Sequence, residues 1–435
     1  MRARQSRFAG NMAVLVSGSA VSALIGLAAT PLLSRLYSPA EYGVFGVFVA
    51  ALSIFSVIAT MRYDRAIPAA RNDRDAGSVL IVALGTMLVT SVLCCLLVLS
   101  GALGLLMPAT REYGRVLAWS LPLGMAATGT YDALSFWMVR RRDFPTLSFT
   151  KVAQGASSVG SQIGMGVFGF GAMGLIGGQI LGSMMGITRL GRRIRRLDRA
   201  AFAEVSVSGL LGTAKQHRRF PLLSAPAVLL DAFTGALPTL VLAHRFGPAT
   251  AGVFTIVNRV LLAPIALITI NISHIYFSEL AELHRARSNG MLPLFYRRLR
   301  HVALLGAVMI GSMALVVPIV LPTVLGPQWG AASIYFLILS PMIFAGLVSA
   351  PFSGVIDVLH RQDLHFLRDS LRAVILIVAV TYAASYDLAA LPTLQVISIA
   401  GCLNGILYLA ISWYALAASP GRLLPDTPAD APRAN

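Results

Sequence analysis

Long apolar stretches separated by short polar segments are the dominant pattern of this chain. Stretches of 18 or more predominantly apolar residues recur from one end to the other. A helix rises 1.5 Å per residue, so each stretch is long enough to cross the roughly 30 Å hydrocarbon layer of a membrane. Membrane β-barrels alternate apolar and polar residues, and these continuous apolar stretches do not. The stretches predict about twelve transmembrane helices, at 11–34, 40–61, 77–100, 116–139, 146–168, 171–190, 219–243, 249–278, 301–322, 330–357, 371–389 and 392–417.

Composition agrees with this pattern. Hydrophobic residues make up 56% of the 435 residues, charged residues only 12%, and the mean hydropathy is +0.75. Soluble proteins carry about twice as many charged residues. We therefore predict an all-α integral membrane protein whose surroundings are a lipid bilayer.

The basic residues predict the orientation of the chain in the membrane. With the N-terminus inside, 29 of the 35 Lys and Arg residues fall on cytoplasmic segments and only four on outside loops. Basic residues favour the cytoplasmic side, so both termini are predicted to be cytoplasmic. The net charge of +17 is then mostly a topological signal. No nucleic-acid partner is needed to explain it.

An internal repeat divides the chain into halves. The segments "SRLYSPAEYGVFGVF" (34–48) and "AHRFGPATAGVFTIV" (243–257) align at an offset of 209. In this alignment two prolines and two glycines coincide: Pro39 with Pro248, and Gly43 with Gly252. Each half then holds six spans, an even number, so both halves have the same orientation, as in transporters built from parallel repeats.

The repeat predicts the domain organisation. We expect an N-terminal six-helix lobe over 1–190, a basic cytoplasmic linker over 191–218, and a C-terminal six-helix lobe over 219–417. A disordered cytoplasmic tail over 418–435 would follow. A substrate path is expected between the lobes.

Motifs for catalysis and for cofactors are missing from the sequence. The only two lysines, Lys151 and Lys215, are not followed by Ser or Thr, so a phosphate-binding P-loop is excluded. No Cys or His cluster has the spacing of metal ligands. We predict a transporter that is not an enzyme, has no catalytic residues, and binds neither a metal nor another cofactor.

Three stretches resemble a known family: "ATPLLSRLYSPAEYGVFGVFVA" (29–50), "MRYDRAIPAARNDRDA" (61–76) and "LPTLVLAHRFGPATAGVFTIVNRVLLAPIALI" (237–268). They are similar to the polysaccharide-exporting branch of the multidrug/oligosaccharidyl-lipid/polysaccharide (MOP) superfamily, most of all to Wzx-type O-antigen flippases. The resemblance extends over about 10–415 as many weakly specific positions. It implies two six-helix lobes around a central lumen, as in the MATE transporters.

The resemblance also implies a function. Such proteins flip undecaprenyl-pyrophosphate-linked oligosaccharide, a repeat unit of O-antigen, capsule or exopolysaccharide, from the inner to the outer leaflet of the bacterial cytoplasmic (inner) membrane. Their partners include a glycan polymerase and chain-length machinery. The alternative is a cation-coupled exporter of drugs or other small molecules from the same superfamily, which would favour acidic residues in the lumen because its substrates are cations.

Arg259 is the main candidate for substrate binding. It is the only ionised side chain in the apolar run 248–278. An arginine at the centre of a transmembrane helix costs about 2.5–3.5 kcal/mol, so it normally faces an interior path. Two readings stay open: a structural ion pair with Asp231, the other mid-span charge of this half, or a lumen site for the substrate's pyrophosphate. Its neighbour Asn258 is a further lumen candidate.

The first half has its own candidates. Asp132 and Lys151 flank the turn "RRRDF" (140–144) at similar depths and are expected to pair and to line the cytoplasmic entrance, or to pair for packing alone. Arg62 and Arg65 end the second span. There they could attract the lipid phosphate, or lie at the interface as ordinary snorkelling residues.

Coupling to an ion gradient has three candidates: Asp231, His274 and Asn271. The His and the Asn follow Arg259 at spacings of 15 and 12 residues, which place them broadly on one helix face. A histidine there could titrate near neutral pH.

Overall fold

The computed structural model describes residues 2–102, 104, 114–202, 207–286, 290–359 and 361–418. Within these ranges the chain is helical and contains no β-strand, which confirms the predicted fold class. The first half consists of α1 (Arg2–Leu36), α2 (Pro39–Ala59), η1 (Tyr63–Ala69), α3 (Asp73–Leu99), α5 (Gly114–Arg141), α6 (Phe144–Val167) and α7 (Ala172–Leu197). The predicted tail after residue 418 lies outside the described residues.

The second half follows a short helical connection, which consists of η3 (Arg199–Phe202), α8 (Val207–Gln216) and a π-helical turn at Phe220–Ser224. The long helices of this half are α9 (Ala225–Arg285), α10 (Met291–Leu325), α11 (Ala331–Ser349), α13 (Gln362–Ser385) and α14 (Ala390–Ala417). Short elements join them: η5 (Pro327–Trp329), η6 (Ala350–Ser353) and α12 (Gly354–Val358). Ten of the predicted spans thus have a corresponding long helix, and the remaining two share α9.

Gly247 divides α9 into two segments, 225–246 and 248–285. Its backbone has φ 81° and ψ 173°, a conformation that only glycine adopts without strain. The break falls between the predicted spans 219–243 and 249–278. By length and composition, seven helical stretches of the described residues could cross a membrane, and one of them, Phe220–Val260, runs through this break. The count of twelve stays a prediction.

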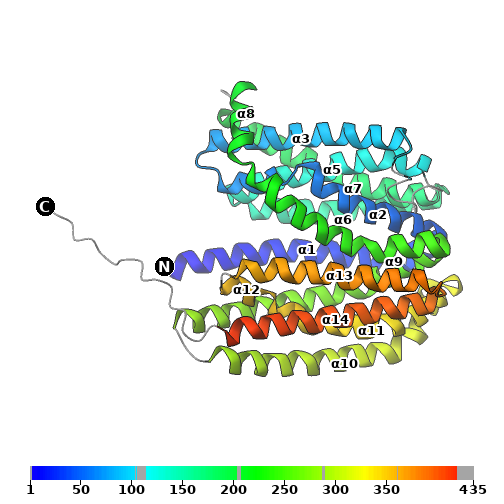
Figure 1. Ribbon diagram of the computed structural model, residues 1–435. Helices are drawn as coiled ribbons and strands as arrows, with labels where there is room; N and C mark the ends of the chain where they lie inside the picture. Colours follow the sequence, from blue (N-terminus) through cyan, green and yellow to red (C-terminus); the bar gives the residue numbers. More distant parts are fainter. Residues whose placement is uncertain are drawn as a thin grey trace.

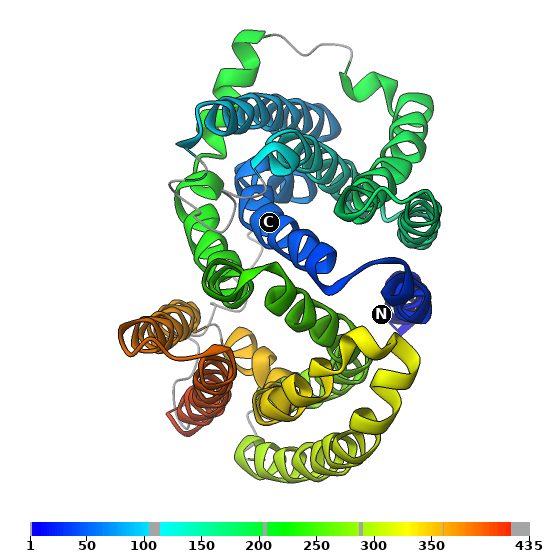
Figure 2. The same cartoon turned by 90° about the vertical axis from the view of Figure 1, so that its right-hand side faces the viewer.

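The helices form two bundles with the same pattern of neighbours (Figures 1 and 2). In the first half, α1 packs on α6, α6 on α7, and α3 on α5. In the second half, α9 packs on α13, α13 on α14, and α10 on α11. The main contact between the bundles joins α2 to α9. The exact bounds of the two lobes stay a prediction.

The contact between α2 and α9 uses the repeated residues reciprocally. A Cβ atom added to Gly43 would overlap the carbonyl oxygen of Pro248, and one added to Gly252 would overlap that of Pro39. The two contacts are therefore equivalent under the repeat: the glycine of each copy packs against the proline of the other copy. The two backbones can approach this closely only because both positions lack a side chain.

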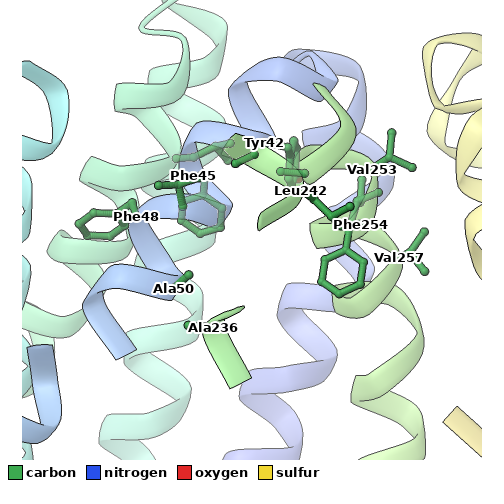
Figure 3. Close-up of a cluster of buried hydrophobic side chains, with 14 of the residues drawn as sticks. Tyr42, Phe45, Phe48, Ala50, Ala236, Leu242, Val253, Phe254 and Val257 are labelled. Atoms are coloured by element: carbon green, nitrogen blue, oxygen red, sulfur yellow. The ribbon is translucent and has the colours of Figure 1, made fainter. Parts of the chain in front are cut away.

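The buried apolar side chains differ between the two ends of the bundle. One cluster contains residues of both lobes, including Tyr42, Phe45 and Phe254 (Figure 3). Trp329 belongs to the same cluster. We call the end where α1 turns into α2 and α10 turns into α11 the joined end. At the opposite end, the split end, each lobe has a separate cluster: 66–83, 131–138 and 190–201 in the first lobe, and 276–295, 352–364 and 411–416 in the second.

Candidate functional site

Two cavities lie between the lobes and share part of their lining. The first lumen cavity has a volume of about 270 Å³ and is lined by α1, α6, α7 and Arg259 of α9. The second lumen cavity has a volume of about 630 Å³ and is lined mainly by α2 and both segments of α9. Arg259 and Gln179 line both cavities. Arg259 therefore lies between the halves, where the substrate path was predicted.

Arg259 reaches from the second lobe toward the first. It lies on the second segment of α9, twelve residues after the break at Gly247. A Cβ atom added to Gly26 of α1 would lie 3.7 Å from the Nη2 atom of Arg259. The guanidinium thus lies beside α1, at a distance where an added methyl group would only touch it. Among the described residues, no carboxylate forms an ion pair with Arg259.

Asp231 pairs with Arg372 and not with Arg259. The Arg372 guanidinium of α13 donates a hydrogen bond to the Asp231 carboxylate of α9, and both side chains line the second lumen cavity. Asn258 lines the same cavity. Of the two readings for Arg259, the pair with Asp231 is therefore not the arrangement found.

Lys151 lines the first lumen cavity together with Arg259. Its ammonium lies 4.7 Å from the centre of the Tyr131 ring, a cation–π contact. Asp132 is within electrostatic range of Lys151. The expected ion pair is thus replaced by the contact with Tyr131, while Lys151 remains available to the cavity.

Arg62 immediately precedes η1 and Arg65 lies within it, and neither residue lines a lumen cavity. Arg62 begins η1 in the left-handed conformation, with φ 64°. The Arg65 guanidinium lies 4.3 Å from the centre of the Phe136 ring, and it pairs with Asp64 at 3.6 Å. The structure thus places these two arginines near Asp132 and not around Arg259.

The two remaining coupling candidates are on the second segment of α9. His274 is exposed and lines neither lumen cavity. The side chain of Asn271 lies outside the described residues. The roles predicted for His274 and Asn271 stay predictions.

Three polar side chains of the site were not predicted from the sequence. Arg372 was counted with the basic residues of a cytoplasmic segment, although it is the second residue of the predicted span 371–389. Gln154 and Gln179 line the first lumen cavity and are uncharged, so they gave no charge signal. A search for amides within the predicted spans would have found both glutamines.

The first lumen cavity is electropositive and otherwise polar. Lys151 and Arg259 approach it from different lobes, and none of its described lining residues is acidic. The remaining polar lining consists of the amides of Gln154 and Gln179 with serine hydroxyls. Such a lining is suited to an anion whose other groups exchange hydrogen bonds with amides and hydroxyls.

Solved structures share this fold. The chain is similar to the lipid II flippase MurJ in an inward closed conformation, with TM-score 0.72 and 12% identity over 92% of this chain and 87% of that one. It is also similar to an inward-facing multidrug resistance MATE family transporter of the MOP superfamily, with TM-score 0.64 and 13% identity over 93% and 94%. A MOP superfamily transporter from Pyrococcus furiosus gives TM-score 0.54 and 13% identity over 94% and 96%. Identities this low show a common fold only.

The sequence supplies the family. Among curated proteins no significant match is found. The sequence profile of the polysaccharide biosynthesis proteins matches residues 32–334. This range contains both copies of the repeated segment and both turns that define the joined end, from α1 to α2 and from α10 to α11. Because this match covers more than half of the chain, the chain belongs to the polysaccharide biosynthesis protein family. Its fold is the one found in solved transporters of the MOP superfamily, as the resemblance in the sequence implied.

Proposed function

We propose that this protein flips undecaprenyl-pyrophosphate-linked oligosaccharide from the inner to the outer leaflet of the bacterial cytoplasmic membrane by alternating access. One observation carries the proposal. Lys151 of the first lobe and Arg259 of the second line the same cavity without an acidic neighbour among its described lining residues. Two opposed cations are suited to a ligand that carries a pyrophosphate.

The chemistry of the lining favours this substrate class. A guanidinium offers a planar fork of donors that matches phosphate oxygens, and an ammonium adds a compact second charge. Taking a pyrophosphate out of water is expensive, and fixed positive charges in the lumen offset that cost. The amides of Gln154 and Gln179 can exchange hydrogen bonds with sugar hydroxyls.

Orientation follows from the charge pattern. The basic segments 62–75, 140–142 and 290–300 lie at the split end, which we assign to the cytoplasm. The joined end then faces the periplasm. In the conformation of this structure the apolar clusters of the two lobes are separate at the split end, which permits the substrate to enter from the cytoplasm. Release of the substrate to the periplasm requires the joined end to open. Partnership with a glycan polymerase and its chain-length machinery belongs to the same proposal.

The cation exporter is the less favoured alternative. Such a protein needs a carboxylate that is available to a cationic substrate. Asp231 is the acidic residue of the second lumen cavity, and its carboxylate is already occupied by Arg372. We propose instead that phosphate oxygens can replace Asp231 on Arg372 once the substrate has bound at Arg259.

Substitution of the two lumen cations tests the proposal. Arg259→Ala and Lys151→Gln should each leave the protein inserted but reduce surface glycan at least tenfold, with lipid-linked repeat units accumulating inside. Loss of one hydrogen-bonded charge of this kind costs about 2–5 kcal/mol. Arg259→Lys should rescue only partly because the fork is lost. Arg218→Gln removes an exposed positive charge of the linker and is the matched control.

The readout is surface glycan per amount of membrane-inserted protein. Normal glycan export by Arg259→Ala at wild-type protein level would contradict the proposed role. Robust efflux of cationic dyes from proteoliposomes would favour the exporter instead.

A further inference from the structure

A second electropositive hollow lies outside the lumen, between the N-terminal part of α6 and the C-terminal part of α7. It has a volume of about 630 Å³ and shares no lining residue with the two lumen cavities. We call it the arginine groove. Its lining comprises four arginines of α7 and the apolar side chains around them: Arg189, Arg192, Arg193, Arg196, Phe149, Ala153, Met185 and Leu197, together with Thr150 and Thr188.

The groove carries excess positive charge. None of its described lining residues is acidic. Arg193 has a neighbouring partner, because its Nε atom lies 2.5 Å from the Asp143 carboxylate. Arg189 lies over the Phe149 ring at 3.9 Å, which fixes its guanidinium without neutralising it. Arg192 and Arg196 form no ion pair among the described residues.

Two other arginines at the split end, Arg140 and Arg141, are arranged differently. Arg140 pairs with Asp73 at 3.1 Å, and Arg141 pairs with Asp198 at 2.5 Å. These ion pairs hold the first lobe together and satisfy the local charge. In the arginine groove only Arg193 has such a partner, so the charges of its other three arginines are open to an anion from outside the chain.

The position of the groove along α7 indicates where that anion comes from. Arg189 follows Ala172, the first residue of α7, by 17 residues, and Arg196 follows it by 24. At 1.5 Å per residue these arginines lie about 26–36 Å along the helix, which is the level of the far headgroup layer when the hydrocarbon is roughly 30 Å thick. Just before them, the exposed side chains of Leu181, Met184 and Met185 give the helix an apolar surface.

The arginine groove combines positive charge with exposed apolar surface. Phe149 is 52% exposed and Met185 is 50% exposed, although both line a groove that contains arginines. A soluble anion would use only the guanidinium groups. An amphiphile would use both parts, with its phosphate on the arginines and its acyl chains on the phenylalanine and methionine.

We propose that the arginine groove binds an anionic phospholipid of the leaflet at the split end, through its phosphodiester group. Arg192 and Arg196 donate to the phosphate oxygens, and Arg189, held by Phe149, supports them. Because the groove lies outside the lumen, this lipid is a bound component of the transporter and not its cargo. The proposal holds whether or not the lumen carries a lipid-linked glycan.

Native mass spectrometry of the detergent-purified full chain tests the proposal. The protein is titrated with phosphatidylglycerol and, separately, with phosphatidylethanolamine of the same acyl chains. We expect at least tenfold tighter retention of phosphatidylglycerol. The double variant Arg192→Gln with Arg196→Gln should lose about an order of magnitude or more of that affinity, because each basic residue at an anionic lipid surface contributes about fivefold.

Matched variants separate the groove from general charge effects. Arg218→Gln with Arg219→Gln removes the same charge from exposed positions next to the π-helical turn at Phe220–Ser224, outside the groove, and should leave binding within about twofold. Arg192→Lys with Arg196→Lys should retain part of the affinity, since the charge stays while the forked donors are lost. All of these positions are exposed, so the variants are expected to fold, and unchanged elution on size-exclusion chromatography checks this.

Two further arms distinguish a lipid from a free phosphate. Met185→Ser should weaken phosphatidylglycerol binding severalfold, and millimolar inorganic phosphate should not displace the lipid. Displacement by phosphate, together with no effect of Met185→Ser, would overturn the proposal in favour of a soluble anion. Wild-type binding of phosphatidylglycerol by the Arg192→Gln and Arg196→Gln variant would also overturn it.

Discussion

The two ends of the molecule are built on different principles. At the joined end, side chains of both lobes share one apolar cluster, and Trp329 of the second lobe packs at 5.3 Å against Tyr42 of the first. At the split end, each lobe buries its own apolar cluster. One interface therefore joins the lobes, while at the other end the buried apolar contacts lie within single lobes. Opening the joined end therefore need not unfold either lobe.

Residue types explain this difference. At the joined end, the glycines of the repeat let α2 and α9 approach closely, and the indole of Trp329 donates to the Ser34 carbonyl oxygen at 2.9 Å. At the split end, ion pairs form within a lobe, as between Arg298 and Glu279 in the second.

Locking the joined end should have the largest effect. A Cβ atom at Gly46 would lie 3.3 Å from the Cβ atom of Thr255, close to the 3.5–4.5 Å of a disulfide. With the native cysteines replaced by serine, Gly46→Cys combined with Thr255→Cys should cross-link on oxidation and abolish transport. Transport should return when the bond is reduced.

Each single cysteine variant is the control for that experiment. Full glycan export by the oxidised, cross-linked protein would show that the lobes need not part at this end. The comparison between the two ends would then describe a fixed architecture and not one state of a cycle.

Weakening the joined end should shift the conformational equilibrium. Trp329 is fully buried, and truncation of such a side chain costs about 3–5 kcal/mol. In a cysteine-free background, Ser53→Cys in the second lumen cavity should be protected from an impermeant thiol reagent added outside. Adding Trp329→Ala should make it reactive, and Trp329→Phe should have an intermediate effect. Equal labelling with and without Trp329→Ala would mean that this contact does not hold the lobes.

The reciprocal glycines test the symmetry of the interface. A methyl group at Gly43 or Gly252 would overlap a proline carbonyl, so each alanine variant should cost about 1–3 kcal/mol. The two costs should be similar because the contacts are equivalent. Gly160→Ala, where the added methyl meets nothing within 4 Å, should be neutral. Thermal unfolding in detergent measures all three, and clearly unequal losses at the two glycines would break the symmetry argument.

Asp143 at the split end should give the smallest effect. It caps α6 by accepting from the Thr146 amide at 3.3 Å, and loss of such a cap costs about 1 kcal/mol. Burial raises the pKa of the Asp143 carboxyl, but hydrogen bonds from Arg193 and Thr146 and the Arg193 charge outweigh burial and hold the pKa below its ordinary value. This stabilisation is therefore present at neutral pH and is lost as the pH falls through the lowered pKa.

Asp143→Ala should thus lower the unfolding temperature slightly at neutral pH and make it less sensitive to acid. The cross-linking of the joined end should be unaffected, because the substitution lies within one lobe. Identical acid dependence of variant and wild type would contradict the role assigned to this carboxylate.

The positions of the helices were largely predictable because they depend on local pattern. An apolar stretch long enough to span a membrane forms a helix wherever it lies, and the break at Gly247 follows from a glycine between two such stretches. The repeat also indicated which segments are equivalent. It did not reveal that Gly43 would meet Pro248 and that Gly252 would meet Pro39.

The candidate site was predictable only in part. Arg259 was identifiable because a charge inside an apolar run is expensive wherever the helix points. The surroundings of Arg259 were not predictable. Asp231 pairs with Arg372 on α13, and Lys151 contacts the Tyr131 ring and lines the same cavity as Arg259. Depth along a helix can be counted in the sequence, but the rotation and tilt that aim a side chain depend on all of its neighbours.

The sequence by itself thus determined the all-helical membrane class, the placement of the spans, the repeat and the presence of buried charge, because each rests on composition or on short-range periodicity. Tertiary structure alone decided which charges pair, which line the lumen, and which end of the molecule joins the lobes. These outcomes depend on contacts between helices that are far apart in the chain, such as α2 with α9 and α9 with α13. Their energies are set by close packing and by charge burial, which exist only once the helices have assembled.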